Sequence, residues 1–253
     1  MATIKKNRET VRRVRRAKAA RPFRATPSFM VAAAPVVFVL LWSTGFIVAR
    51  YGTRDAGPLT FLFLRMVIAA GVLWAIAVAT NAPAISPTQV KWAMLTGLGM
   101  HAIYLGGVFI ASDLGLPSGV SALIAGLHPV VTSVGALLLL SEKLRPQQWI
   151  GVGCGLGGVV TVVIDRLNAG VSGITAGAVV AMVISVVGMS VGTLLQRSRG
   201  VTMPLLRGTA VQYMISAVVL GIGAVSVEHF EVRWTARFWW SLVWAVVVLS
   251  IAA

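Results

Sequence analysis

Eight apolar segments of membrane-spanning length follow one another along the chain, and short loops join them. A helix needs about 20 apolar residues to cross a bilayer. Only 11% of the 253 residues are charged, whereas a soluble domain of this length carries about a quarter. The sequence therefore predicts an all-α integral membrane protein with about eight transmembrane helices. The predicted spans are 29–49, 59–80, 90–112, 117–140, 147–164, 172–195, 207–226 and 237–253.

The positive charge is concentrated at the N-terminus, where the segment 1–28 holds ten of the 22 Lys and Arg residues. The apolar stretch that follows is too long for the apolar part of a signal peptide, so we expect a retained first span. With the N-terminus inside, sixteen basic residues fall inside and five outside, although without the tail the count is six against five. The bias predicts a multi-pass protein of the cytoplasmic membrane with a cytoplasmic N-terminus. A basic cluster beside a first span is typical of contact with anionic lipid, and we expect no nucleic-acid partner.

A short internal repeat is present at a shift of about 147 residues. The segment "STGFIVAR" (43–50) aligns with "SVGTLLQR" (190–197), which matches a Ser, a Gly and an Arg. Because five spans precede the repeat, the second unit would be inverted in the membrane, a pattern typical of transporters. We expect a first five-helix unit at 29–164 and an incomplete second unit of three helices at 172–253, so that an inverted 5+5 repeat is truncated in its second half.

The segment "SALIAGLHPVVTSVGALLLLSEKLRPQQWIGVGCGLGGVVTVV" (121–163) is the most distinctive part of the chain. A span with a central proline ends in Glu-x-Leu-x-Pro and leads through Gln and Trp into a glycine-rich span. This resembles the fourth-to-fifth helix signature of the EamA family in the drug/metabolite transporter superfamily. "LLWSTGFIVAR" (40–50) and "GPLTFLFLRMVIAAGVL" (57–73) are similar to the first and second helices of that family.

The resemblance implies a ten-helix fold of two inverted five-helix repeats around a central cavity. It also implies export of amino acids or other small metabolites. The equivalents of the ninth and tenth helices are missing from the sequence, and their absence would leave the implied cavity without one wall.

Arg65 is the one Lys or Arg that is not at the end of a predicted span, and it lies about six residues from the outer end of the second span. Six residues correspond to roughly 9 Å at 1.5 Å per residue, so the side chain could extend to the membrane surface. The alternative is a cation that faces the cavity and attracts a carboxylate of the substrate. Asp113, at the outer end of the third span, could be its partner.

Polar residues near the middle of the third and fourth spans form a second set of candidates. Tyr104 follows His101 at i+3, and Ser121, His128 and Thr132 share one face of the next span. Intramembrane polar groups are functional hypotheses by default, so the two faces could line a water-filled path. A hydrogen-bonded pair in a dry helix bundle is the alternative.

Four further residues are candidates for weaker reasons. Trp42 could line a pocket, although Trp is also common at membrane interfaces. Pro129 removes a backbone hydrogen bond in the fourth span, which either shapes packing or frees a carbonyl toward a cavity. Glu142 at the end of that span needs a partner, for which Arg145 or a neighbouring loop is a candidate. Such a pair would clamp the fourth helix to the fifth or act in gating.

The run "GVGCGLGG" (151–158) spaces small residues so that helix backbones can approach closely, within the fold or in a homodimer. Cys154 in this run is expected to be an apolar filler. One cysteine excludes an intrachain disulfide, and no metal-ligand spacing is present.

The leading hypothesis is a secondary transporter that exports a small molecule by alternating access. The alternative is a truncated, non-transporting membrane protein or a helical assembly partner. An intramembrane enzyme is disfavoured, because the sequence contains no His-Glu-x-x-His and no paired intramembrane aspartates. Its one Gly-x-Ser-x-Gly, "GMSVG" (188–192), lies inside a predicted span, and Ser190 has no suitably spaced base. We therefore assign no catalytic residue, metal or cofactor; the expected partners are a small-molecule substrate and the lipid bilayer.

Overall fold

The computed structural model describes residues 29–142, 144–168, 174–198 and 202–252. The chain divides into two compact units, residues 1–38 and 39–253. Of the first unit, the structure describes only the helical stretch 29–38. The basic segment 1–28, for which we predicted contact with anionic lipid, lies outside the described residues.

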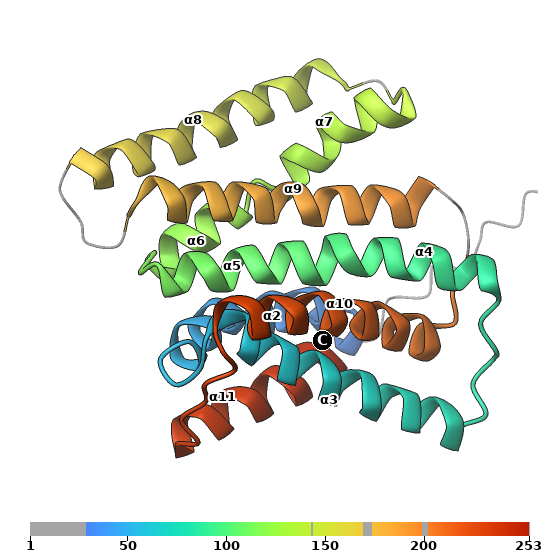
Figure 1. Cartoon of the computed structure of the whole chain (residues 1–253). Coiled ribbons are helices and arrows are strands. Elements are labelled where there is room, and N and C mark those ends of the chain that lie inside the picture. Colours follow the sequence, from blue (N-terminus) through green and yellow to red (C-terminus); the bar gives the residue numbers. More distant parts are fainter. Residues whose placement is uncertain (1–28, 143, 169–173, 199–201, 253) are drawn as a thin grey trace, which may run out of the picture. The chain divides into compact units, whose positions relative to one another are not determined.

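Helices make up almost all of the described chain (Figure 1). In the ranges that the structure describes, the one extended pairing is an isolated bridge between Ala56 and Val232. Two of the helical segments, η1 and η2, are π-helical. In chain order the elements are α2 (Phe29–Gly52), α3 (Pro58–Ala79), α4 (Pro87–Gly97), η1 (Leu98–Ile103), α5 (Tyr104–Asp113), α6 (Ser118–Ala125), α7 (His128–Leu140), α8 (Pro146–Asn168), α9 (Ala176–Ser198), α10 (Leu205–Val227), α11 (Ala236–Val246) and η2 (Val247–Ala252).

The helices fall where the hydropathy pattern places the spans. Within the described residues, six helical segments are long and apolar enough to cross a membrane. Two shorter apolar helices, Val36–Gly52 and Ala236–Ile251, correspond to the first and last predicted spans. The prediction of an all-α integral membrane protein is therefore confirmed.

The helix starts follow ordinary capping chemistry. Prolines occupy the first position of α3, α4 and α8, where the missing N–H costs nothing. Ser86 and Gln89 form a capping box at the start of α4. The hydroxyl of Thr235 accepts a hydrogen bond from the N–H of Phe238 and caps α11.

The helices α3 and α10 form an antiparallel pair at the core of the second unit. Phe61, Leu62 and Met66 of α3 are completely buried. The close approach depends on small residues of α10, because a Cβ added to Gly221 would lie 2.7 Å from the ring of Phe63. Glu228, directly after α10, reaches back to the first turn of α3, which fixes the antiparallel orientation.

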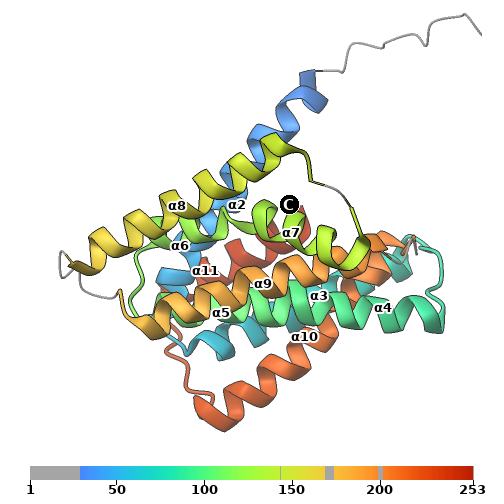
Figure 2. The same cartoon turned by 90° about the horizontal axis from the view of Figure 1, so that it is seen from above.

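Helix α9 lies beside the α4–η1–α5 segment in both views (Figures 1 and 2). Glycines again permit the contact: a Cβ on Gly99 of η1 would lie 2.7 Å from the carbonyl oxygen of Gly188 and 3.0 Å from the backbone of Gly192. The small residues that allow this close contact are therefore Gly188 and Gly192 of α9 and Gly99 of η1.

The predicted glycine contact of the 151–158 run is mostly not made within the described chain. A Cβ on Gly151, Gly153, Gly157 or Gly158 of α8 would meet nothing within 4 Å. Gly155 alone in this run faces a neighbour, the side chains of Val130 and Leu127. Cys154 is exposed. The homodimer through this face stays a prediction.

Three spans are locally irregular. The fourth span is broken between α6 and α7 at Gly126 and Leu127, and Pro129 lies in the first turn of α7. In place of a kink at Pro129, the helix of this span is therefore interrupted at the two residues between α6 and α7. The third and eighth spans each contain a π-helical turn, an irregularity that is frequent at functional sites.

The helix boundaries recur along the chain with the predicted period. α9 begins 147 positions after α2, and α10 begins 147 positions after α3. The π-turn η2 begins 149 positions after η1. This spacing supports the predicted inverted repeat.

Candidate functional site

Arg65 is buried between helices and does not extend to the membrane surface. Its side chain comes from the second turn of α3, and the residue is 5% exposed. Nε donates a hydrogen bond to Oγ of Ser250 at 2.9 Å, and Nη2 donates to the carbonyl oxygen of Leu249 at 3.4 Å. Both partners belong to η2, so the cation points into the bundle.

No carboxylate among the described residues lies within ion-pair distance of Arg65. Asp113, the partner considered from the sequence, instead lines a surface pocket where α5 ends. Neutral acceptors compensate a buried guanidinium only in part, and a buried charge is costly unless it is paired. Arg65 is therefore a buried cation with hydrogen bonds but no counter-charge in the described chain.

Ser250 connects Arg65 to a tyrosine of α10. Its hydroxyl accepts from Arg65 and donates to the carbonyl oxygen of Ala245 at 3.0 Å. The hydroxyl of Tyr213 donates to the Ser250 carbonyl oxygen at 3.1 Å. The π-helical turn thus offers both a side chain and a carbonyl oxygen to residues of other helices.

His101 lies on η1 and bonds to the same segment of α10. Its Nε2 is 3.2 Å from Oε1 of Gln212, and Nε2 of Gln212 donates to the hydroxyl of Thr96 at 3.2 Å. With Oε1 as the acceptor, His101 carries its proton on Nε2. The imidazole also packs edge-on against Tyr213, with 4.7 Å between ring centroids.

The aromatic residues predicted from the sequence complete this group. The rings of Trp42 and Tyr104 stack at 6.5 Å with 10° between their planes. Arg65 lies within electrostatic range of the side chains of His101, Tyr104 and Tyr213. We call this group the central polar cluster; it consists of Trp42, Arg65, His101, Tyr104, Gln212, Tyr213 and Ser250.

The hydrogen bonds of the cluster follow the internal repeat. Arg65 and Gln212 are each the eighth residue of their helix, 147 positions apart. His101 and Ser250 are each the fourth residue of their π-turn, 149 positions apart. Arg65 bonds to Ser250, and Gln212 bonds to His101. The bond between Arg65 and Ser250 is therefore repeated as the bond between Gln212 and His101, with the two units exchanged. This is the pattern of a pseudo-twofold arrangement.

A second, smaller group surrounds His128 at the start of α7. Nδ1 of His128 is 3.1 Å from the hydroxyl of Ser190 on α9 and 3.3 Å from that of Thr132. His128 and Thr132, which we predicted to share one face of the helix, therefore contact each other directly. Ser121 is 2% exposed, and its hydroxyl has no hydrogen-bond partner in the described part of the chain. His101 and His128 bond to different helices, and the structure does not join them.

Glu142 pairs with a different residue from the one proposed from the sequence. Its Oε1 lies 2.9 Å from Nη2 of Arg197, at the end of α9. Arg145 instead donates its backbone N–H to Oε1 of Gln148. The pair links α7 to α9, so a clamp from the fourth to the fifth helix is not what the structure shows. Both side chains are about half exposed, 44% and 59%, and such pairs contribute little stability.

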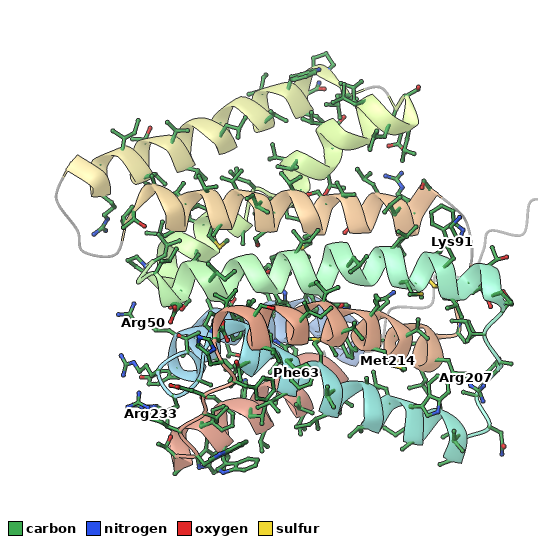
Figure 3. All side chains as sticks on the ribbon, in the orientation of Figure 1. Arg50, Phe63, Lys91, Arg207, Met214 and Arg233 are labelled. Carbon is green, nitrogen blue, oxygen red and sulfur yellow. The ribbon has the colours of Figure 1, made fainter. Side chains whose placement is uncertain are left out.

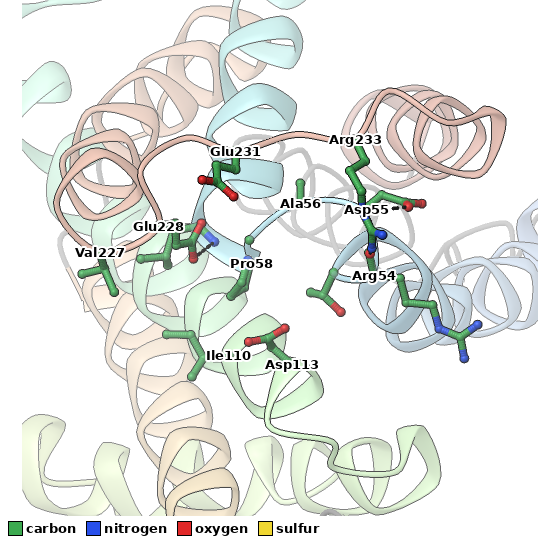
Figure 4. A pocket seen from close by; sticks show the side chains of 13 residues that line it. Arg54, Asp55, Ala56, Pro58, Ile110, Asp113, Val227, Glu228, Glu231 and Arg233 are labelled. Carbon is green, nitrogen blue, oxygen red and sulfur yellow. Dashed lines mark hydrogen bonds and ion pairs between the residues drawn. The ribbon is translucent and has the colours of Figure 1, made fainter.

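The loops beside the N-terminus of α3 are held together by Asp55, whose side chain is 1% exposed. Figure 4 labels this residue at the edge of the adjoining pocket. Asp55 accepts two hydrogen bonds from Arg237, at 2.7 Å to each carboxylate oxygen, and a third from Thr235 at 2.8 Å. The Arg237 guanidinium lowers the pKa of Asp55 to about 2, against the opposing effect of burial. This loop lies outside the spans and connects the α2–α3 turn to α11.

Glu228 makes a second connection at the same end. Its carboxylate accepts from the backbone N–H groups of Leu59 and Thr60 and from the hydroxyl of Thr60. An anionic group at a helix N-terminus stabilises the helix dipole. The adjoining surface pocket of about 650 Å³ is lined by Asp113, Glu228 and Glu231, among others (Figure 4).

Several residues of these sites are absent from the sequence-based candidates. Gln212, Tyr213 and Ser250 lie inside predicted spans, so the search for intramembrane polar groups that selected His101 applies to them equally. Asp55 and Glu228 lie in loops between spans, where acidic residues are ordinary and carry no signal of a specific contact.

The fold and the cluster define the class: a helical, multi-pass membrane protein with charged and hydrogen-bonding groups enclosed between its helices. The model of the EamA-like transporter family matches residues 29–164. This is more than half of the chain, so the chain belongs to the EamA-like transporter family.

Curated relatives agree with this assignment. The chain is similar to the "uncharacterized inner membrane transporter YedA" of Escherichia coli K12, at 28% identity over 132 residues that cover 52% of this chain and 41% of that protein. It is also similar to a "probable amino-acid metabolite efflux pump" of the same organism, at 24% identity, with 53% of this chain and 42% of that protein covered. The chain thus spans about two fifths of the length of these relatives.

A solved crystal structure has the same fold. It overlaps the chain with a TM-score of 0.58 at 23% identity, and the match covers 85% of this chain and 74% of that one.

Proposed function

We propose that this protein is a secondary exporter that moves small metabolites bearing a carboxylate, amino acids among them, across the cytoplasmic membrane by alternating access. The efflux pump named among its relatives supports the direction and the general substrate class. Arg65 carries the proposal, because it is a buried cation without a counter-charge in the described chain.

A substrate carboxylate would supply the counter-charge that Arg65 does not have among the described residues. Guanidinium and carboxylate groups form charge-assisted, often bidentate, hydrogen bonds. In the structure, Ser250 and Leu249 occupy donors of Arg65 with neutral oxygens. Exchange of these neutral acceptors for a carboxylate would couple binding to movement of η2, the segment that carries both residues.

The other predicted residues have distinct roles in this proposal. Trp42 and Tyr104 form an aromatic wall for the apolar part of the substrate, and His101 hydrogen-bonds its polar part. His128, Thr132 and Ser121 extend the polar path along α6 and α7. Pro129, Glu142 and Arg145 shape the fourth span and its end, where Glu142 binds Arg197 and the span adjusts during gating.

The proposed orientation places the N-terminus in the cytoplasm. The Asp55 and Glu228 contacts then lie on the outer side, and the Glu142–Arg197 pair lies inside. The excess of basic residues on the N-terminal side supports this orientation. Green fluorescent protein fused to the N-terminus tests it: fluorescence in intact cells is expected, and a dark fusion of normal abundance would reverse the assignment.

The Arg65→Gln variant tests the substrate role. Hydrogen bonds to charged groups contribute about 1.5–3 kcal/mol, so binding of a carboxylate substrate should weaken roughly 10- to 100-fold. The full-length protein is purified, and a panel of amino acids is compared with the corresponding carboxamides by thermal-shift titration and by uptake into proteoliposomes.

The parent protein should prefer the acid over the carboxamide, and Arg65→Gln should lose this preference while still inserting into membranes. Arg166→Gln, at an exposed position on α8, is the matched control. Equal transport of acid and amide by the parent, or unchanged transport by Arg65→Gln, would refute the role of Arg65.

A further inference from the structure

An apolar groove runs along the outer surface of the α3–α10 seam, away from the central polar cluster. It encloses about 460 Å³ and is lined by residues that include Phe63, Val67, Gly71, Trp74, Met214 and Val218. Figure 3 shows Phe63, Met214 and Arg207 following one another along this seam. A second hollow of about 410 Å³ continues beyond Phe63 and Val218, which line both.

The floor of the groove is open because α3 has a glycine there. A Cβ on Gly71 would meet nothing within 4 Å, in contrast to Gly221 on the facing helix, where it would meet the ring of Phe63. The walls project into the surroundings, with Trp74 41%, Met214 52% and Val218 55% exposed. The groove therefore has room for an apolar chain that the described residues do not fill.

The length of the groove matches one leaflet of a bilayer. Phe63 and Trp74 are separated by eleven helical residues, or roughly 16 Å at 1.5 Å per residue. Half of the hydrocarbon core is about 15 Å thick. In α3 these two residues lie on either side of the helix centre, so an acyl chain that enters beside Trp74 would fill the groove and reach past the membrane midplane.

A cation stands at the headgroup end. The guanidinium carbon of Arg207, in the first turn of α10, lies 5.8 Å from the centre of the Trp74 ring. Its Nε is buried and has no hydrogen-bond acceptor among the described residues. A buried donor without an acceptor is unfavourable, and a phosphate oxygen is a strong acceptor for guanidinium.

We propose that the α3–α10 groove binds an anionic glycerophospholipid, with one acyl chain along Gly71 and the headgroup phosphate on Arg207. The occupant is a lipid because the groove opens on the apolar surface of a membrane protein and ends at a cation at headgroup depth. Basic sites between transmembrane helices are a recurrent mode of anionic lipid binding. The site is separate from Arg65 and does not depend on the proposed substrate.

Native mass spectrometry of the detergent-purified full-length protein tests the site. The protein is titrated with palmitoyl-oleoyl phosphatidylglycerol and, separately, with the zwitterionic phosphatidylcholine of the same chains. Gly71→Leu blocks the floor of the groove, and Arg207→Gln removes the charge. Gly158→Leu and Arg166→Gln, both on α8, are the matched controls, since a Cβ on Gly158 also meets open space.

We expect Gly71→Leu to weaken phosphatidylglycerol binding at least tenfold and Arg207→Gln to reduce the preference over phosphatidylcholine at least fivefold. Both α8 controls should stay within twofold of the parent. If Gly71→Leu does not fold, Val218→Phe blocks the groove from the other helix.

Unchanged lipid binding in the blocked protein would overturn the proposal, as would an unchanged headgroup preference in Arg207→Gln. A dimeric parent that becomes monomeric in Gly71→Leu, without a change in bound lipid, would assign the groove to a second copy of the chain and equally overturn it.

Discussion

The ion pair of Asp55 permits a quantitative test of how the loops at one end of the bundle are held together. The Asp55 side chain is 1% exposed, and it receives three hydrogen bonds from Arg237 and Thr235. The perturbation is Asp55→Asn, which keeps the size and one carbonyl oxygen but removes the charge.

The magnitude follows from the pKa of this carboxyl, which falls from 3.8 to about 2 in the folded protein. Each pKa unit corresponds to about 1.4 kcal/mol, so the pair contributes on the order of 2 kcal/mol, less some screening because the Arg237 side chain is 41% exposed. A folded-state pKa below the unfolded one stabilises at pH values above the unfolded pKa. This stability is lost as the pH falls from about 4 to about 2.

The assay is thermal unfolding of the detergent-purified protein between pH 7 and pH 2.5. Near pH 7, Asp55→Asn should lower the midpoint by roughly 4–8 °C, at about 2–4 °C per kcal/mol for a chain of this size. The difference should hold down to about pH 4 and narrow below it. Asp165→Asn, on the exposed face of α8, serves as the control and should match the parent.

Two results would refute this reasoning. Equal midpoints at pH 7 would show that the pair contributes no net stability. A constant difference down to pH 2.5 would show that the substituted amide disturbs the packing of the loop, and that the loss of charge is not the cause.

Three further substitutions separate buried from exposed contacts. Glu228→Gln should lower stability by about 1–2 kcal/mol in chemical unfolding, because the charge-assisted cap on α3 is lost; no change would mean that the cap is replaced by water. Gly99→Ala should lower the unfolding midpoint by several degrees, since its Cβ would lie 2.7 Å from a backbone oxygen, and a neutral result would show that α9 can shift. Glu142→Gln should change stability by less than about 0.5 kcal/mol, because its pair with Arg197 is solvated, and a large loss in calorimetry would contradict this.

Hydropathy predicted the helices of this protein well because the bilayer imposes their length and polarity. The spans agree with the helices to within about one turn. Their interruptions were harder to predict. Pro129 indicated the break before α7, but the π-turn at Leu98–Ile103 has no proline to mark it in the sequence, and it packs against α9 and α10.

The candidate site was predicted in part for a related reason. The polarity of Arg65, His101 and Tyr104 inside spans marks them in the sequence, and the structure brings them together. Their partners depend on helix rotation and crossing, which a single sequence does not specify. Asp113 was therefore a reasonable partner for Arg65 by depth, whereas the fold turns Arg65 toward Ser250.

The predicted inverted repeat would account for the position of the central polar cluster. In an inverted repeat, equivalent positions of the two units face one another across the pseudo-twofold axis, so one polar position in each unit is enough to build a paired site. Arg65 and Gln212 occupy one such position, and His101 and Ser250 occupy the other. The geometry is nearly symmetric, but the chemistry is not, because one half carries a permanent cation and the other a neutral amide.

A substrate bound at this site would be oriented with its negative group toward α3. Exchange of the two residues, Arg65→Gln with Gln212→Arg, should preserve the charge of the site while reversing that orientation. Restored binding in the exchanged protein, with transport lost, would show that the asymmetry sets the orientation. Substrate binding by Arg65→Gln as strong as that of the parent would show that Arg65 serves packing alone.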